Sequence, residues 1–275
     1  REKSAWRPWI ILPGHGVAIF ITVRPGRPPC IEPRGFSGYT ARMWTSLLLT
    51  LTLLVNTNPA QRQAQLQAAR QACPTSAEAA WLLATGGQDT TGCLAKVAPK
   101  LKFLVPVIAA DQLRRAVKLE EAAALLAKSF NPKDAAPVRR LMLAELQLYL
   151  GRVDDAMGHV DRIVDDYQRG FIGKTEWELW AAGSAAVHKR DWEAAEEAFD
   201  KLDADHPSFV PGQLAGGEYD RVREYYARAL RRLGRAVTAA GWHAPTLVAA
   251  ARALLENPYV ETSGEAIEHA KRAIE

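Results

Sequence analysis

Histidines and paired acidic residues are the side chains of this sequence best suited to catalysis or metal binding. No two histidines lie three to five residues apart, so no helix face presents a histidine pair to a metal ion. The sequence also lacks a phosphate-binding loop, a zinc-protease pair and a serine elbow. The paired acids Asp154/Asp155 and Asp165/Asp166 fall at predicted helix ends or exposed faces, where solvated charges are expected. We therefore predict no catalytic residue, no metal site, no cofactor and no enzymatic activity.

Two of the three cysteines, Cys73 and Cys93, bracket a predicted short helix and a glycine-containing return. In an exported chain two such cysteines favour a disulfide. The alternative is two unrelated buried thiols. A metal site is not expected, because two cysteines without a nearby histidine supply too few of the four ligands that zinc takes.

Four arginines lie on one side of a single helix predicted over residues 218–241. They recur at spacings of seven, four and three residues, away from the apolar face of that helix. Such a row would suit an acidic segment of a partner. The alternative is a solvated face whose charge is reduced by Glu218, Asp220 and Glu224. The arginines are Arg221, Arg228, Arg232 and Arg235.

Net positive charge is confined to the start of the chain. The whole sequence has 35 basic and 31 acidic side chains. Residues 1–42 hold seven of the basic and two of the acidic ones, and residues 43–60 hold none, which leaves 28 basic and 29 acidic residues in 61–275. The body therefore gives no electrostatic reason to expect a nucleic acid or an anionic membrane as partner.

Residues 1–42 form a Pro/Gly-rich extension with six of the 16 prolines and five of the 19 glycines. Such a composition opposes long helices and leaves little apolar surface to bury. Two interpretations fit: a disordered or weakly structured extension, or upstream sequence translated by mistake before Met43. We expect the second, because Met43 begins a segment that suits a protein start.

Residues 43–60 resemble an export signal. The apolar run Leu47–Val55 has nine residues, whereas a membrane-spanning helix needs about 20. A short apolar core followed by a small residue is typical of a cleaved signal peptide, here with Ala60 before the cut. We therefore expect a periplasmic, cell-envelope or secreted protein that meets the membrane only transiently. The alternatives are an uncleaved anchor or a buried segment, the latter in a cytoplasmic protein.

From Gln61 onward the sequence predicts an all-α chain, because alanine, leucine, arginine and glutamate dominate. Helices are predicted from Asp111 to the residues before Pro132, and over 134–151, with a second short helix directly after Gly151. The stretch "PGQLAGG" is predicted to be a loop before the helix 218–241. Further helices are predicted from about Pro245 to Asn257 and over 263–275.

Two stretches carry a resemblance to a known family. "LMLAELQLYLGRVDDAMGHVDRIVDDY" and "EWELWAAGSAAVHKRDWEAAEEAFDKLDADHP" each combine a first helix containing small residues, a tight turn and a second helix with alanine near its start. Both resemble tetratricopeptide repeats, which are helix pairs of about 34 residues. In the first stretch Ala144, Gly151 and Ala156 match the family pattern, and in the second stretch Ala182 and Ala195 match it. Residues 61–133 match this pattern poorly.

The resemblance implies antiparallel helix-pair repeats over 134–275, stacked as a short α-solenoid after an N-terminal helical region 61–133. It also implies a non-catalytic scaffold that binds a protein or peptide on a concave surface. Trp177 is the candidate for such a surface, whereas Trp180 and Trp192 are expected in the core. The alternatives are a repeat region of a larger envelope enzyme, such as a cell-wall hydrolase, and a cytosolic adaptor. We expect the repeats or another domain to continue past residue 275.

Overall fold

The computed structural model describes residues 10–11, 18–19, 59–128 and 136–258 of the chain. The chain divides into two units, residues 1–48 and 49–275. In the first unit, strand β1 (Ile10–Ile11) pairs antiparallel with β2 (Ala18–Ile19). The rest of the predicted extension 1–42, the predicted signal segment up to residue 58 and the predicted helix 263–275 lie outside the described residues.

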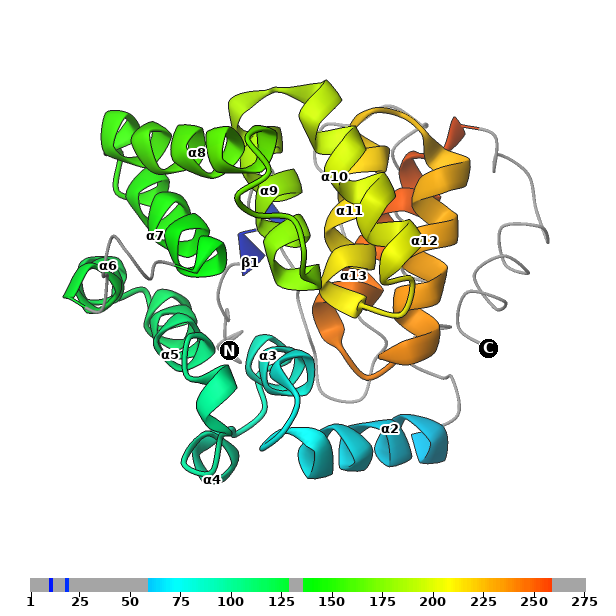
Figure 1. Cartoon of the computed structure of the whole chain (residues 1–275). Coiled ribbons are helices and arrows are strands. Elements are labelled where there is room, and N and C mark those ends of the chain that lie inside the picture. Colours follow the sequence, from blue (N-terminus) through cyan, green and yellow to red (C-terminus); the bar gives the residue numbers. More distant parts are fainter. Residues whose placement is uncertain (1–9, 12–17, 20–58, 129–135, 259–275) are drawn as a thin grey trace, which may run out of the picture. The chain divides into compact units, whose positions relative to one another are not determined.

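The described residues of the second unit form twelve α-helices and a 3₁₀ turn over Pro99–Leu101 (Figure 1). The prediction of an all-α fold of paired helices is confirmed. The helix bounds are α2 Pro59–Ala72, α3 Ala77–Thr85, α4 Thr91–Leu94, α5 Leu104–Arg115, α6 Leu119–Lys128, α7 Pro137–Tyr149, α8 Val153–Gln168, α9 Glu176–Lys189, α10 Trp192–Asp205, α11 Val210–Val222, α12 Tyr226–Ala239 and α13 Ala244–Glu256.

Four helix pairs, α5/α6, α7/α8, α9/α10 and α11/α12, stack one after another. The first helix of each pair also packs on the first helix of the next pair, so that α3, α5, α7, α9, α11 and α13 form one inner row. This row curves back on itself, because α3 also contacts α11. The architecture is therefore a short α-solenoid whose inner helices meet again.

A left-handed residue occupies the turn inside every one of the four pairs. Val117, Gly151, Arg190 and Glu224 have φ values of 60°, 73°, 60° and 63°. Successive turns are therefore 34, 39 and 34 residues apart. The extra five residues of the middle interval fit the connection between α8 and α9, where Glu178 accepts hydrogen bonds from three consecutive backbone N–H groups, those of residues 173–175.

Each helix pair has a small buried residue on its first helix and a larger buried one at the matching position of its second helix, and in α9/α10 and α11/α12 the two lie closely opposed. An added Cβ at Gly183 would lie 2.8 Å from the Phe199 ring, and one at Gly217 would lie 2.6 Å from Leu233. The members of each pair lie 16 residues apart, and all are buried. Small side chains let the two helices approach closely enough for the large ones to fill the space. The four pairs are Ala110/Leu126, Ala144/Val160, Gly183/Phe199 and Gly217/Leu233.

The same spacing in α5/α6 means that a repeat unit of this kind falls within the predicted N-terminal region 61–133. The predicted loop "PGQLAGG" is wrong, because these residues lie inside α11. The predicted helix 218–241 is also wrong, since it comprises the end of α11, a turn at Glu224 and all of α12. The predicted helix from Asp111 to the residues before Pro132 is wrong for the same reason, because it comprises the end of α5, a turn at Val117 and α6. Packing explains the difference: an added Cβ at Gly212 would lie 2.5 Å from Leu202, so close approach outweighs the weak helix propensity of glycine.

Polar contacts join the first helices to the last ones. The Glu78 carboxylate on α3 accepts a hydrogen bond of 2.6 Å from the backbone N–H of Val210, the first residue of α11. Gln65 on α2 donates to the Thr238 carbonyl oxygen at 2.9 Å and accepts from the Gly241 N–H at 3.2 Å. These contacts span 132 to 176 residues of sequence, so α2 and α3 close the inner row against α11 and the end of α12.

Candidate functional site

Arg232 lies at the centre of a buried ion-pair network between α10, α11 and α12. Its side chain is 1% exposed, and it donates to the carboxylates of Asp200 at 2.6 Å and Asp220 at 3.0 Å. It also donates to the Phe199 carbonyl oxygen at 3.2 Å. A buried guanidinium requires such paired and hydrogen-bonded surroundings, because an isolated charge in the interior is strongly unfavourable.

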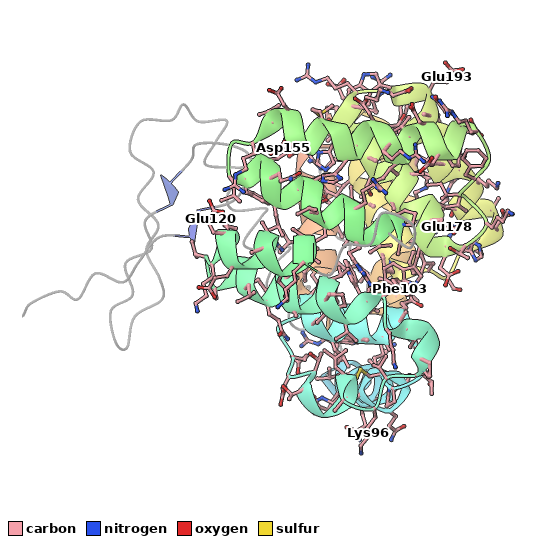
Figure 2. The ribbon with its side chains drawn as sticks, turned by 60° about the vertical axis from the view of Figure 1, so that its left-hand side comes forward. Lys96, Phe103, Glu120, Asp155, Glu178 and Glu193 are labelled. Carbon is pink, nitrogen blue, oxygen red and sulfur yellow. A yellow bond between two sulfur atoms is a disulfide. The ribbon has the colours of Figure 1, made fainter. Side chains whose placement is uncertain are left out.

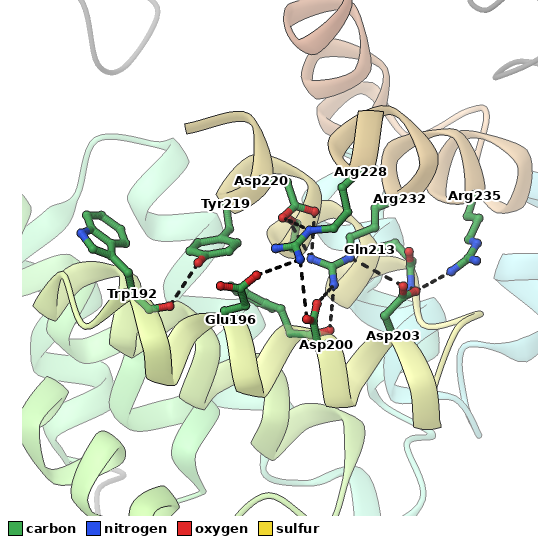
Figure 3. Close-up of polar contacts among 12 residues, drawn as sticks. Trp192, Glu196, Asp200, Asp203, Gln213, Tyr219, Asp220, Arg228, Arg232 and Arg235 are labelled. Carbon is green, nitrogen blue, oxygen red and sulfur yellow. Dashed lines mark hydrogen bonds and ion pairs between the residues drawn. The ribbon is translucent and has the colours of Figure 1, made fainter. Parts of the chain in front are cut away.

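Arg228 belongs to the same network one helical turn earlier. It donates to Asp220 at 2.6 Å and to Glu196 at 2.9 Å. Burial raises the pKa of Asp220 above its ordinary value, against the opposing effect of the Arg232 and Arg228 charges. Figure 3 shows these arginines extending from α12 toward the carboxylates of α10 and of Asp220 on α11.

Arg235 belongs to the same network through Asp203, whereas Arg221 forms separate ion pairs. Arg221 pairs with Glu218 at 3.0 Å and with Glu256 on α13, whereas the more exposed Arg235 pairs with Asp203. Asp203 also accepts a hydrogen bond of 3.0 Å from the Gln213 side chain. All four arginines of the predicted row therefore have carboxylate partners within the chain.

The prediction that Arg221, Arg228, Arg232 and Arg235 form a row available to a partner is corrected by this geometry. It depended on one continuous helix, but Arg221 lies on α11 and the other three lie on α12. The turn at Glu224 changes the chain direction, so the residues face α10 and α13. Their contacts hold these helices together.

Trp177 is also placed differently from the prediction, because it is buried in the inner row. Its ring packs edge-on against Phe209 at a centroid distance of 4.9 Å and against Trp180 at 5.8 Å. Trp81 from α3 meets both tryptophans, at 6.4 Å and 6.2 Å. Since α3 reaches the same row as α9 and α11, the chain's own aromatic rings cover Trp177.

His243 joins α3 to the N-terminus of α13. The Thr85 hydroxyl donates to the Trp81 carbonyl oxygen at 2.7 Å, so it accepts a hydrogen bond from His243 Nε2 at 2.9 Å. The Thr246 hydroxyl then donates to Nδ1 at 2.8 Å. Burial, together with the Arg115 charge, lowers the pKa of His243 to about 4. The imidazole is therefore neutral near pH 7, and both of its nitrogens are hydrogen-bonded.

Cys73, directly after α2, and Cys93, in α4, are joined by a disulfide with a Cα–Cα distance of 5.8 Å (Figure 2). The sequence left open a disulfide or two unrelated buried thiols, and the structure contains the disulfide. It attaches the end of α2 to α4. Figure 2 shows the bond near Lys96, at the end of the molecule that contains α4.

A partly exposed surface at the turn between α11 and α12 combines aromatic rings with arginines. We name the residues Trp192, Val222, Arg223, Tyr225 and Arg228 the aromatic–arginine surface. The Arg223 guanidinium carbon lies 5.2 Å from the Trp192 ring centroid and 5.9 Å from that of Tyr225. Arg228 approaches the Tyr225 ring at 5.1 Å. Val222 and Tyr225 are 55% and 42% exposed.

A hollow adjoins the aromatic–arginine surface, with Tyr225 and Arg228 belonging to both. The remaining lining residues are Glu224, Tyr226, Ala227 and Asn257. Aromatic and arginine side chains are enriched at the centres of protein interfaces. This surface is therefore the candidate site of the described residues.

Sequence reasoning identified Arg228 but missed Arg223 and Tyr225. Both were assigned to the interior of a continuous helix, and the turn that exposes Tyr225 was not predicted. The run "VREYYAR" did contain a signal, because two adjacent tyrosines cannot both face the core of one helix.

Neither a recognised kind of site nor a comparison with known proteins gives this surface a role. Within residues 59–128 and 136–258, no group of three or more His, Cys, Asp or Glu residues could hold a metal ion. No helix in these ranges has the length and apolar character needed to cross a membrane. A scan of protein-family models and searches of curated proteins and solved structures found no match to this chain.

Proposed function

We propose that this chain is a non-catalytic helical-repeat scaffold that binds a protein or peptide partner through the aromatic–arginine surface. The observation that carries the proposal is the exposure of Tyr225 and Val222 beside Arg223, at the edge of stacked helix pairs. An exposed tyrosine ring flanked by guanidinium groups has the composition of an interface centre. The recurring left-handed turns support membership of the tetratricopeptide-like class of repeats, for which partner binding is the usual role.

The concave side of the solenoid is a weaker candidate than this edge. Trp81, Trp177 and Phe209 pack together where the inner helices meet, so the chain itself fills the space that an open solenoid offers to a peptide. The turn edge retains exposed apolar side chains. We therefore place the interface at the edge.

Site-specific photocrosslinking in the producing cells tests the proposal. A photoreactive phenylalanine analogue replaces Tyr225 in one variant and Val248 in the control, because Val248 is a similarly exposed apolar residue on α13. We expect one specific adduct at position 225 and none at 248. The adduct partner, purified and titrated against the full chain, should bind about tenfold more weakly to a Val222→Ser/Tyr225→Ala variant. Equal adducts at both positions, or unchanged affinity, would contradict the proposal.

We also propose that the scaffold works in an oxidising compartment such as the periplasm or cell envelope. The Cys73–Cys93 disulfide supports this, since such bonds persist mainly outside the reducing cytoplasm. Mass spectrometry of the native protein, alkylated without reductant, should show Cys73 and Cys93 unmodified. Two alkylated thiols would instead favour the cytosolic adaptor.

A further inference from the structure

Arg223 differs from Arg221, Arg228 and Arg232 in its surroundings. Those three arginines each pair with at least one carboxylate. For Arg223, no ion pair with a carboxylate within 4.0 Å is found among the described residues. Its positive charge is therefore not neutralised by a neighbouring carboxylate, unlike the charges of the other three. A carboxylate supplied by a partner would neutralise it through charge-assisted hydrogen bonds.

The geometry around Arg223 holds its guanidinium for such an acceptor. The side chain lies against Trp192 at 5.2 Å and near Tyr225 at 5.9 Å, so two aromatic rings restrict its rotamers. A guanidinium that rests on an aromatic ring keeps its N–H edge available for a planar, bidentate acceptor. A carboxylate matches this geometry and forms charge-assisted hydrogen bonds.

The neighbouring side chains indicate what else the partner must contain. Val222 and Tyr225 are exposed next to Arg223, and Tyr225 also lines the hollow. An apolar side chain adjacent to the carboxylate would cover them. Arg228, by contrast, is already neutralised by Asp220 and Glu196 and adds little attraction.

We propose that the aromatic–arginine surface binds an acidic peptide segment, with a carboxylate on Arg223 and an adjacent apolar side chain on Val222 and Tyr225. This inference rests on the proposed function and names its partner class. Glu224 is the acidic residue that lines the hollow, and it opposes an acidic ligand. Its removal is therefore expected to strengthen binding.

A displayed library of random dodecapeptides, selected on the purified full chain, provides the probe. We expect the recovered peptides to place Asp or Glu next to an aromatic or aliphatic residue. In calorimetric titrations, Arg223→Gln should weaken these peptides about tenfold, and Arg223→Lys should recover only part of the affinity because lysine lacks the planar fork. Glu224→Gln should bind a few-fold more tightly, roughly as expected for loss of one nearby like charge. Arg169→Gln removes an exposed arginine at the end of α8 and should have no effect.

Circular dichroism and a thermal melt of each variant show whether the fold is retained. The inference is overturned if no peptide is recovered, if the peptides show no excess of acids, or if a folded Arg223→Gln variant binds them unchanged. Its failure can be told apart from that of the proposed function. A partner crosslinked at position 225 that binds the Arg223→Gln variant normally would refute the acidic ligand and leave the scaffold role standing.

Discussion

His243 shows how one side chain depends on segments far apart in sequence. It is the residue before α13, yet its Nε2 donates to Thr85 on α3, 158 residues earlier. Trp81 and Trp242 flank the ring at centroid distances of 5.9 Å each. A proton added to this imidazole would place a second positive charge near Arg115 in a site without water access.

We therefore expect the protein to lose stability as the pH falls from about 6.5 to 4. The pKa of His243 is about 4 in the folded state, below its ordinary value of 6.5, so the unfolded state binds the proton first. The stabilising contribution is complete above pH 6.5 and is lost as pH falls through 4, by at most roughly 3 kcal/mol. Urea denaturation at several pH values measures this change.

A His243→Gln variant provides the control for that series, because it lacks the titrating group. Burial also lowers the pKa of His159, which acts in the same direction. Burial raises the pKa of Glu78. Its contribution to stability is present below the ordinary pKa of 4.5 and is lost as the pH rises, so it acts in the opposite direction. If wild type and variant have the same pH dependence, His243 does not determine it.

Arg232 and Arg235 provide a second comparison of single residues. Replacing Arg232 with Met leaves the fully buried Asp220 with Arg228 alone, and should lower the free energy of unfolding by about 3 kcal/mol or more. Arg235→Met breaks a more exposed pair with Asp203 and should cost less than about 1 kcal/mol. Chemical denaturation of both variants tests the contrast, and equal losses would show that burial of the network is unimportant.

At the scale of the elements, the packing of α11 on α12 depends on a close approach of the two helices. Substitutions at Gly217 and Gly158 test this. A Cβ at Gly217 would lie 2.6 Å from Leu233, so Gly217→Ala must push α11 and α12 apart and should cost about 1–3 kcal/mol. Gly158 in α8 has nothing within 4 Å of the added Cβ. Gly158→Ala should therefore stabilise the protein by about 0.5–1 kcal/mol. Thermal melts of both variants should give opposite signs.

Much of the helical fold could be predicted from the sequence, because apolar periodicity and turn residues are local signals. The pairs α7/α8 and α9/α10 followed from Gly151 and from the alanines and apolar residues of their facing surfaces. The pair α11/α12 did not, since Glu224 is an unusual residue for a left-handed turn and three glycines occur within α11. The opposing side chains of Leu202, Arg232 and Leu233 explain these glycines, and sequence reasoning does not show which distant residues oppose them.

The candidate site could be predicted only in part, for the same reason. The interpretation of the arginine spacing assumed that all four arginines lie on one straight helix. On that assumption, the burial of Arg232 and the exposure of Tyr225 could not both be deduced. Trp177 was assigned to a free surface because Trp81, which covers it, lies 96 residues away in a region that did not match the repeat pattern. The pairing of Cys73 with Cys93 was one of two alternatives, since both residues lie near each other in sequence.

At the scale of the molecule, the disulfide should contribute to the stability of the whole described helical unit. Cys73 and Cys93 are 20 residues apart, and closing a loop of this length restricts the unfolded chain by about 3 kcal/mol. A Cys73→Ser/Cys93→Ser variant should lose roughly this amount of unfolding free energy. Wild-type protein with a reductant should unfold like the variant. A difference between the two would show how much of the change comes from the serine substitutions and how much from loss of the disulfide.

The contacts between α3 and the last helices also limit how this gene can change. An open solenoid gains or loses whole repeats readily, because each unit touches only its neighbours. Here Glu78 and Thr85 hold Val210 and His243, so a unit added or deleted between them would move α3 away from both. Recombination between similar repeats should therefore be poorly tolerated in this chain, and its repeat number should stay fixed while individual residues diverge.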